Sequence, residues 1–168
     1  MNKNLILLGM MGVGKTTIGR ILAKKLNLEF VDTDEHIEKK NSMSITEIFE
    51  KNGEKFFRTE EENEISKLSK KDGCVFALGG GAFMNEVLRE HILKNCLSIW
   101  LDIDLNILVG RTSANKNRPL LKNINTSEKI KEIYKERKNI YALANHKINC
   151  DKLNKNDIVK KISKLYEK

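Results

Sequence analysis

Short apolar runs alternate with longer amphipathic stretches along the whole chain. Residues 4–8, 74–78 and 97–101 form runs that are too short and too apolar for surface helices, and they predict buried strands. Weaker signals of the same kind lie at residues 29–31 and 147–150 and predict two further strands.

The stretches between these runs carry apolar residues at helical spacing. The residues that mark the expected helices are Ile18, Ile21, Leu22 and Leu26; Ile45, Ile48 and Phe49; Phe57, Ile65 and Leu68; Val87, Leu88 and Ile92; Leu105, Leu108 and Val109; Ile130, Ile133, Tyr134, Ile140 and Tyr141; and Ile158, Ile162 and Leu165. Ser44 and Glu47 have the spacing of a capping box at the start of the second helix. The alternation predicts an α/β fold, a mainly parallel sheet flanked by helices.

The chain reads as one domain, residues 1–168, because it has no linker, repeat or low-complexity tract. Residues 112–125 are polar, have no period and hold the sole proline, so they predict a mobile lid.

Composition excludes several classes of protein. The net charge of +8 comes from scattered lysines, and aromatic residues make up only 6% of the chain, which argues against a nucleic-acid binder. Cys74, Cys96 and Cys150 form no CxxC pair, which favours buried thiols in a reducing cytosol over disulfides or zinc. No apolar run is long enough to span a bilayer or to form a signal peptide. We therefore expect a cytoplasmic protein with no membrane or nucleic-acid partner, and a monomer because no extended apolar seam is evident.

The strongest motif is the segment from Gly9 to Thr16, which satisfies G-x-x-x-x-G-K-S/T between an apolar strand and an amphipathic helix. Its glycines let consecutive backbone N–H groups surround phosphate, and the helix that follows directs its positive end at the same anion. Lys15 would reach the β and γ phosphates, and the Thr16 hydroxyl would bind Mg²⁺. The motif predicts a nucleoside triphosphate site that includes Gly12, Val13, Gly14, Lys15, Thr16 and Thr17.

Two further groups of residues follow predicted strands, at the edge where ligands bind in open α/β sheets. On an extended chain the carboxylates of Asp32 and Asp34 would face one site, with Mg²⁺ and an acceptor hydroxyl as their targets, although solvated turn acids would look the same. Gly79, Gly80 and Gly81 would bring backbone N–H groups close to a ligand, or form a plain tight turn.

Three arginines stand out in a chain whose basic residues are mostly lysine. Arg58, Arg118 and Arg137 are candidates because a guanidinium binds carboxylate or phosphate through two hydrogen bonds. Arg137 lies on or beside an apolar helix stripe, where it would either serve a site or extend its head to solvent. Arg118 lies in the expected lid and could close over the transferring phosphoryl group.

Together these motifs resemble the shikimate kinases. The resemblance runs through most of the chain, from the phosphate loop and Arg20, through Asp32-Thr33-Asp34, Ser44-Ile45, Glu47-Ile48-Phe49, Gly53-Glu54, Phe57-Arg58, Glu61 and Gly79-Gly80-Gly81, to Arg118-Pro119-Leu120-Leu121, Arg137 and Tyr141.

The resemblance implies ATP-dependent phosphorylation of the 3-hydroxyl of shikimate, on a three-layer P-loop fold with a five-stranded parallel sheet. It implies that Asp34 holds the acceptor hydroxyl and serves as base, and that Asp32 supports Mg²⁺. Arg58, Arg137 and Gly79 to Gly81 would bind shikimate, Arg118 would reach the phosphates, and Arg111 would pack on adenine. Residues 144–150 lack acidic and threonine residues often seen there in the family, which leaves adenine contacts from that strand open.

Rival hypotheses share the phosphate loop. A kinase for another small hydroxy acid, such as gluconate, would not be expected to need the set from Arg58 to Gly81. A GTP-dependent switch is disfavoured because Asn115-Lys116 is followed by Asn117-Arg118 where an aspartate should close the guanine motif, and no D-x-x-G element is evident. A catalytically inactive binding module would be expected to lose Lys15 or Asp34, and both are present.

Overall fold

A five-stranded sheet forms the centre of the molecule. The computed structural model describes residues 3–68, 70–113 and 126–167. Its strands are β1 (Leu5–Leu8), β2 (Glu29–Asp32), β3 (Cys74–Ala77), β4 (Leu97–Asp102) and β5 (His146–Asn149). They lie in the order β2-β3-β1-β4-β5, and every pairing is parallel. The expected parallel sheet is confirmed, with each strand within one residue of its predicted limits.

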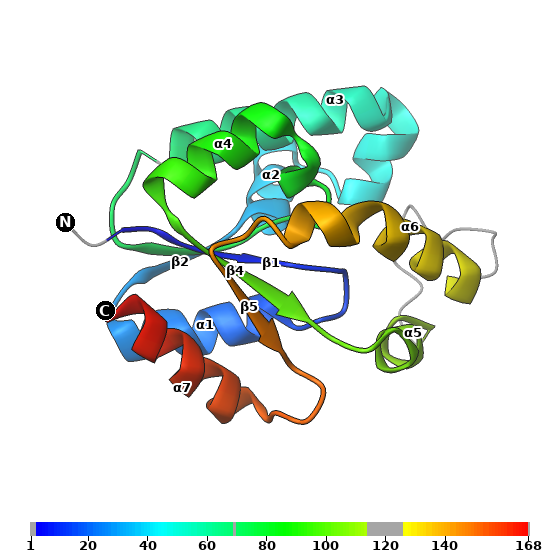
Figure 1. Cartoon of the computed structure of the whole chain (residues 1–168). Coiled ribbons are helices and arrows are strands. Elements are labelled where there is room, and N and C mark those ends of the chain that lie inside the picture. Colours follow the sequence, from blue (N-terminus) through cyan, green and yellow to red (C-terminus); the bar gives the residue numbers. More distant parts are fainter. Residues whose placement is uncertain (1–2, 69, 114–125, 168) are drawn as a thin grey trace.

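Helices cover both faces of the sheet and make the fold three-layered. They are α1 (Lys15–Leu26), α2 (Thr33–Asn41), α3 (Ile45–Leu68), α4 (Glu86–Asn95), α5 (Leu105–Ser113), α6 (Thr126–Tyr141) and α7 (Lys155–Tyr166), with a short 3₁₀ helix η1 (Ala82–Met84). Helices α1 and α7 lie together on one face, and α3, α4 and α6 lie over the other (Figure 1).

The order of the strands follows from their hydrophobicity. β1 is buried along its whole length between β3 and β4, as expected for an apolar run with no polar face. β2 and β5 are less apolar and take the two edges of the sheet. Because β1 and β3 are neighbours, the loops that leave their carboxyl ends meet at one place.

Helix α2 was not predicted, and the extended geometry expected for Asp32, Thr33 and Asp34 is wrong beyond Asp32. Asp32 ends β2 and caps α2, and its carboxylate accepts hydrogen bonds from the backbone N–H groups of Asp34 and Glu35. The chain therefore turns into a helix at Thr33, which changes the direction in which the Asp34 side chain leaves the backbone.

Helix α3 joins the two helices predicted around residues 45–49 and 57–68. Gly53 interrupts it with φ 81° and ψ 167°, a backbone conformation that glycine adopts readily. The predicted capping box is confirmed, because Ser44 Oγ accepts from the N–H of Glu47 at 3.3 Å and Glu47 Oε2 accepts from the N–H of Ser44 at 2.8 Å. Ile37, Ile48 and Phe57 form a small second core that joins α2 to α3.

The expected lid, residues 112–125, falls mostly outside the described residues. Its first two residues, Thr112 and Ser113, are the end of α5. Within the described part of the chain, no helix combines the length and the apolar character that a membrane crossing needs.

Candidate active site

Loops from four strands converge at the carboxyl edge of the sheet. The phosphate loop (Gly9 to Thr16) leaves β1, Asp32 ends β2, the glycine turn (Gly79 to Gly81) leaves β3 and Asp102 ends β4. Open α/β sheets bind their ligands at such an edge. The parallel order of the strands alone therefore places the site at this edge.

The phosphate loop has the geometry that its motif predicts. Gly14 caps α1 with a φ of 100°, so that the chain turns into the helix with its first N–H groups exposed to the loop. Lys15 Nζ crosses the loop and donates to the carbonyls of Gly9 and Met10 at 2.9 and 3.1 Å. A cavity of about 230 Å³ opens beside these groups, and its lining includes Gly12, Gly14, Lys15, Thr16, Thr17, Asp32 and Asp34. The side chain of Val13 is buried in the core, which anchors the loop from below.

Thr16 and Asp32 meet inside this cavity. The Thr16 hydroxyl donates to Asp32 Oδ2 at 2.6 Å, while Oδ1 of the same carboxylate is held by the start of α2. A hydroxyl beside a carboxylate fits Mg²⁺, which takes oxygen ligands and keeps waters and phosphate oxygens for its remaining positions. In the described residues no three His, Cys, Asp or Glu side chains gather as a metal site, and Thr16 and Asp32 are the residues here that could hold such an ion.

The carboxyl group of Asp34 lies between the phosphate loop and the glycine turn. Its Oδ1 atom is buried and has no hydrogen-bond partner among the described residues. Burial raises the pKa of Asp34 to about 6, with a further contribution from Asp32, while Lys15 opposes the rise. A carboxyl with a pKa near neutrality and an unsatisfied oxygen can hold a hydroxyl and accept its proton.

The glycine turn is shaped by the side chains packed on it. A Cβ atom at Gly79 would lie 2.5 Å from Glu61 Oε1 and 2.6 Å from Asp34 Oδ1, so only glycine leaves both carboxylates room. Thr33 Oγ1 fixes the turn, since it accepts from the N–H of Gly79 at 3.0 Å and donates to the carbonyl of Ala77 at 3.2 Å.

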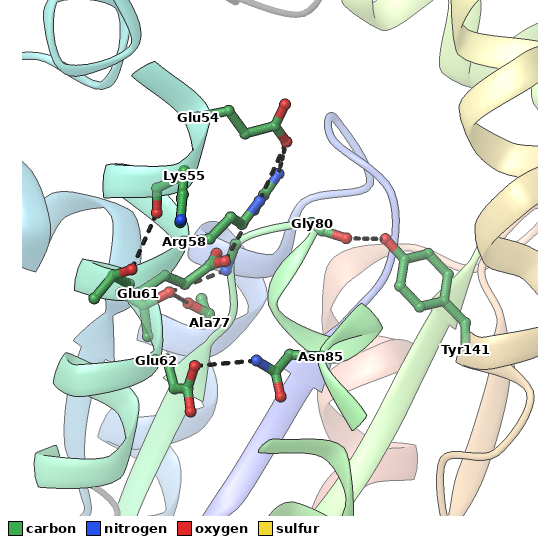
Figure 2. Close-up of polar contacts among 12 residues, drawn as sticks. Glu54, Lys55, Arg58, Glu61, Glu62, Ala77, Gly80, Asn85 and Tyr141 are labelled. Atoms are coloured by element: carbon green, nitrogen blue, oxygen red, sulfur yellow. Dashed lines mark hydrogen bonds and ion pairs between the residues drawn. The ribbon is translucent and has the colours of Figure 1, made fainter. Parts of the chain in front are cut away.

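Arg58 and Arg137 both reach this turn. The Arg58 guanidinium occupies the space of a Cβ at Gly81, and Arg137 Nη1 would lie 2.9 Å from a Cβ at Gly80. Tyr141, one turn after Arg137 on α6, donates its hydroxyl to the carbonyl of Gly80 (Figure 2). Arg137 is 8% exposed, so its head group does not extend to solvent.

A second cavity, called here the arginine cavity, has a volume of about 380 Å³ and opens beside the turn. Its lining is Glu54, Arg58, Glu61, Glu62, Gly81, Ala82, Met84, Asn85, Leu88, Glu136 and Arg137. Two guanidinium groups in one cavity can bind an anion such as a carboxylate. Asp34, which lines the first cavity, and Glu61, which lines the second, both lie beside Gly79.

Glu61 is a site residue to which the sequence analysis assigned no role. Its Oε2 accepts from Arg58 Nη1 at 2.8 Å, and its Oε1 is buried beside Gly79 without a partner in the described structure. Burial raises the pKa of Glu61 to about 7, and the neighbouring Arg58 limits the rise. Its place three residues after Arg58, on the same helix face, was the available signal.

Most of the predicted site residues are brought together, and two are not placed there. Arg111 is exposed on α5, and no contact of it with the two cavities is found. Arg118 lies outside the described residues.

Comparison with known proteins assigns the chain to a family. A family model described as shikimate kinase matches residues 11–167. The chain belongs to the shikimate kinase family. A shikimate kinase from Sulfurihydrogenibium sp. (strain YO3AOP1) is 45% identical over 160 residues, which cover 95% of this chain and 95% of the relative.

Solved shikimate kinases have the same fold. The structure of the Acinetobacter baumannii shikimate kinase in complex with shikimate matches with a TM-score of 0.92 and 37% identity, and covers 97% of this chain and 92% of that one. The Aquifex aeolicus shikimate kinase matches with a TM-score of 0.86 and 34% identity, over 98% and 96% of the two chains. A gluconokinase from Sinorhizobium meliloti is 12% identical with a TM-score of 0.63, which shows a shared fold alone.

Proposed function

We propose that this kinase transfers the γ-phosphoryl group of ATP to the 3-hydroxyl of shikimate. The observation that supports it most is the position of Asp34, which lines the phosphate-loop cavity and lies beside Gly79 and Glu61, where the arginine cavity begins. An acceptor whose hydroxyl is held by Asp34 would present that hydroxyl to the phosphate loop, while the carboxylate of the same acceptor reached Arg58 and Arg137.

The acceptor site follows from the chemistry of its residues. Shikimate carries one carboxylate and three ring hydroxyls, and Arg58 and Arg137 would bind the carboxylate. Gly79, Gly80 and Gly81 would let the ring lie close to the backbone. Asp34, ionised above its pKa of about 6, would orient the 3-hydroxyl and take its proton during transfer.

The phosphate loop would supply the charge that phosphoryl transfer requires. Lys15 would leave the carbonyls of Gly9 and Met10 to bind the β and γ phosphates, and the backbone N–H groups from Gly12 to Thr17 would hold their oxygens. Thr16 and Asp32 would hold Mg²⁺, which neutralises charge on the phosphates when bound.

Two further arginines would contact the nucleotide. Arg118 would approach the phosphates and stabilise charge on the transferring group, as expected of an arginine in a lid. Arg111, at the end of α5, would pack on the adenine ring.

Other properties of the kinase stay predictions. They are a monomeric state, a cytoplasmic location, and the absence of nucleic-acid and membrane partners. Sedimentation of the purified protein would test the first of these.

The test is ADP formation by purified protein with MgATP and, in separate reactions, shikimate, gluconate, AMP or no acceptor. We expect turnover with shikimate and only background hydrolysis in the other three. Turnover with gluconate in place of shikimate would assign the arginine cavity to another hydroxy acid. Equal rates in all four reactions would show that the acceptor site does not direct the reaction.

A further inference from the structure

The guanidinium group that would bind the acceptor carboxylate is already paired with two protein carboxylates. Arg58 Nε and Nη2 both donate to Glu54 Oε1, at 3.3 and 3.1 Å, and Nη1 donates to Glu61 Oε2 at 2.8 Å (Figure 2). The Nε and Nη2 pair forms one of the two edges through which a guanidinium grips a carboxylate with two bonds. Glu54 therefore occupies an edge that an incoming carboxylate could use.

The two glutamates hold Arg58 very differently. The side chain of Glu61 is 3% exposed, whereas that of Glu54 is 58% exposed and that of Arg58 is 32% exposed. An exposed pair four residues apart on a helix contributes little, since water competes for both partners. Glu54 can leave at a small cost, and Glu61 cannot.

The position of Glu54 in α3 also favours its carboxylate after it leaves Arg58. It follows Gly53, where the helical conformation of α3 is interrupted, so it opens the second segment of that helix. The first turn of a helix has unpaired N–H groups and a positive dipole end, both of which favour a carboxylate. Release from Arg58 leaves the charge of Glu54 near that end.

The charges in the cavity favour replacement of one protein carboxylate by the incoming carboxylate over addition of a further anion. Arg58 and Arg137 share the lining with the carboxylates of Glu54, Glu61, Glu62 and Glu136. An additional anion entering this set meets repulsion unless one carboxylate withdraws. Of these four carboxylates, Glu54 and Glu61 are the ones with a bond to Arg58 in the described structure, and of those two it is Glu54 that is exposed to solvent.

We propose that Glu54 is an internal competitor for the acceptor carboxylate and thereby a determinant of acceptor affinity. It holds the Nε and Nη2 edge of Arg58 in the free enzyme and yields it when a carboxylate ligand enters, while Glu61 stays bound at Nη1. This inference rests on the proposed function, because it takes the arginine cavity to be the acceptor site.

The experiment compares Glu54→Gln with the wild type by calorimetric titration of two ligands. Shikimate is the first, and cyclohexanecarboxylate, which offers a carboxylate but no hydroxyl, is the second. If an exposed pair of this kind must be broken for binding, removing it lowers the Kd of both ligands by about two- to fivefold. The KM for ATP should not change, because Glu54 does not line the phosphate-loop cavity.

Glu62→Gln is the matched control. Glu62 lines the same cavity and is bonded to Asn85 at 3.2 Å, with no bond to Arg58 in the described structure. The substitution removes the same charge from the same cavity, so a competitor role for Glu54 predicts a clearly smaller change in Kd for Glu62→Gln. Glu54→Ala, which cannot accept from Arg58 at all, should tighten binding in the same direction as Glu54→Gln.

Three results would overturn the inference. Weaker binding in both Glu54 variants would make Glu54 a positioning residue for Arg58, and unchanged binding would remove it from the acceptor site. Equal tightening by Glu54→Gln and Glu62→Gln would attribute the effect to the overall charge of the cavity. A wild-type enzyme that shows no shikimate-dependent ADP formation would instead contradict the proposed function, whatever the Glu54 variants do.

Discussion

Asp34 illustrates how a single residue can serve the reaction at a cost to the fold. Its Oδ1 atom is buried without a partner in the described structure, and its pKa is raised to about 6 by burial and by Asp32. A general base works best when its pKa lies near the working pH, and this position provides that. The same burial makes the ionised form unfavourable in the folded protein.

Asp34→Asn should lower kcat for shikimate by about 10²- to 10⁴-fold, the usual contribution of a positioned acid or base. ATP binding should be nearly unchanged, because Lys15, Thr16 and the loop backbone stay in place. Steady-state kinetics and a nucleotide titration would measure the two effects separately. Loss of nucleotide binding together with activity would give Asp34 a different role.

The same substitution should stabilise the protein at high pH. A carboxyl whose folded pKa is raised binds a proton more readily in the folded state, so its contribution to stability is full below about 3.8 and is lost as pH rises through about 6. Asparagine carries no such charge, and we expect Asp34→Asn to gain about 1–3 kcal/mol at pH 8 and little at pH 4. Urea unfolding at both values would check this, and a variant less stable than wild type at pH 8 would contradict it.

At the scale of elements, the glycine turn is where three helices meet the sheet. Asp34 reaches it from α2, Glu61 and Arg58 from α3, and Arg137 from α6. Each of these side chains uses space that a Cβ atom would fill. Because its residues have no Cβ atoms, the turn lets these four side chains pack against its backbone.

Gly81→Ala should disable the acceptor site in a folded protein. The new methyl group would collide with the end of the Arg58 side chain, which can move away, so we expect a cost in stability of about 1 kcal/mol or less. The KM for shikimate should rise at least tenfold, while the KM for ATP stays close to the wild-type value. Thermal unfolding and steady-state kinetics would test the two statements, and an unchanged shikimate KM would show that Arg58 does not need its present position.

The sequence predicts elements well where apolar residues repeat and poorly where they do not. All five strands were predicted from apolar runs, and the capping box at Ser44 was predicted from the spacing of Ser44 and Glu47. Helix α2 was not, because Ile37 is its single buried apolar residue with a large side chain. The available signal was Asp32 followed three residues later by Glu35, the spacing of a capping box.

Contacts between elements were the other gap in the sequence analysis. The phosphate loop was predicted from its motif. Asp34, Arg58 and Arg137 were candidates from their residue types and positions, and the resemblance implied their roles. The bonds from Thr33 to the glycine turn and from Tyr141 to Gly80 join residues 44 or more positions apart along the chain, and no local pattern encodes them. Glu54 and Glu61 were visible as part of a motif, but their opposite exposure became evident only in the folded molecule.

At the scale of the whole molecule, two cavities on one edge of the sheet account for a reaction between two anions. The phosphate loop and Asp34 line one cavity, Arg58, Arg137 and Glu61 line the other, and Gly79 is approached by Asp34 from the first and by Glu61 from the second. Phosphoryl transfer depends on positioning and charge neutralisation more than on covalent help from the protein. The order β2-β3-β1 provides that positioning, because it sets the loop after β1 beside the turn after β3.

The most direct test of this account is the identity of the phosphorylated product. Phosphorus and proton magnetic resonance of a reaction containing enzyme, MgATP and shikimate should show one new phosphomonoester, coupled to the ring proton at carbon 3 and equal in amount to the ADP formed. Inorganic phosphate in place of an ester, or an ester on another hydroxyl, would contradict the proposed position of the acceptor between Asp34 and the two arginines.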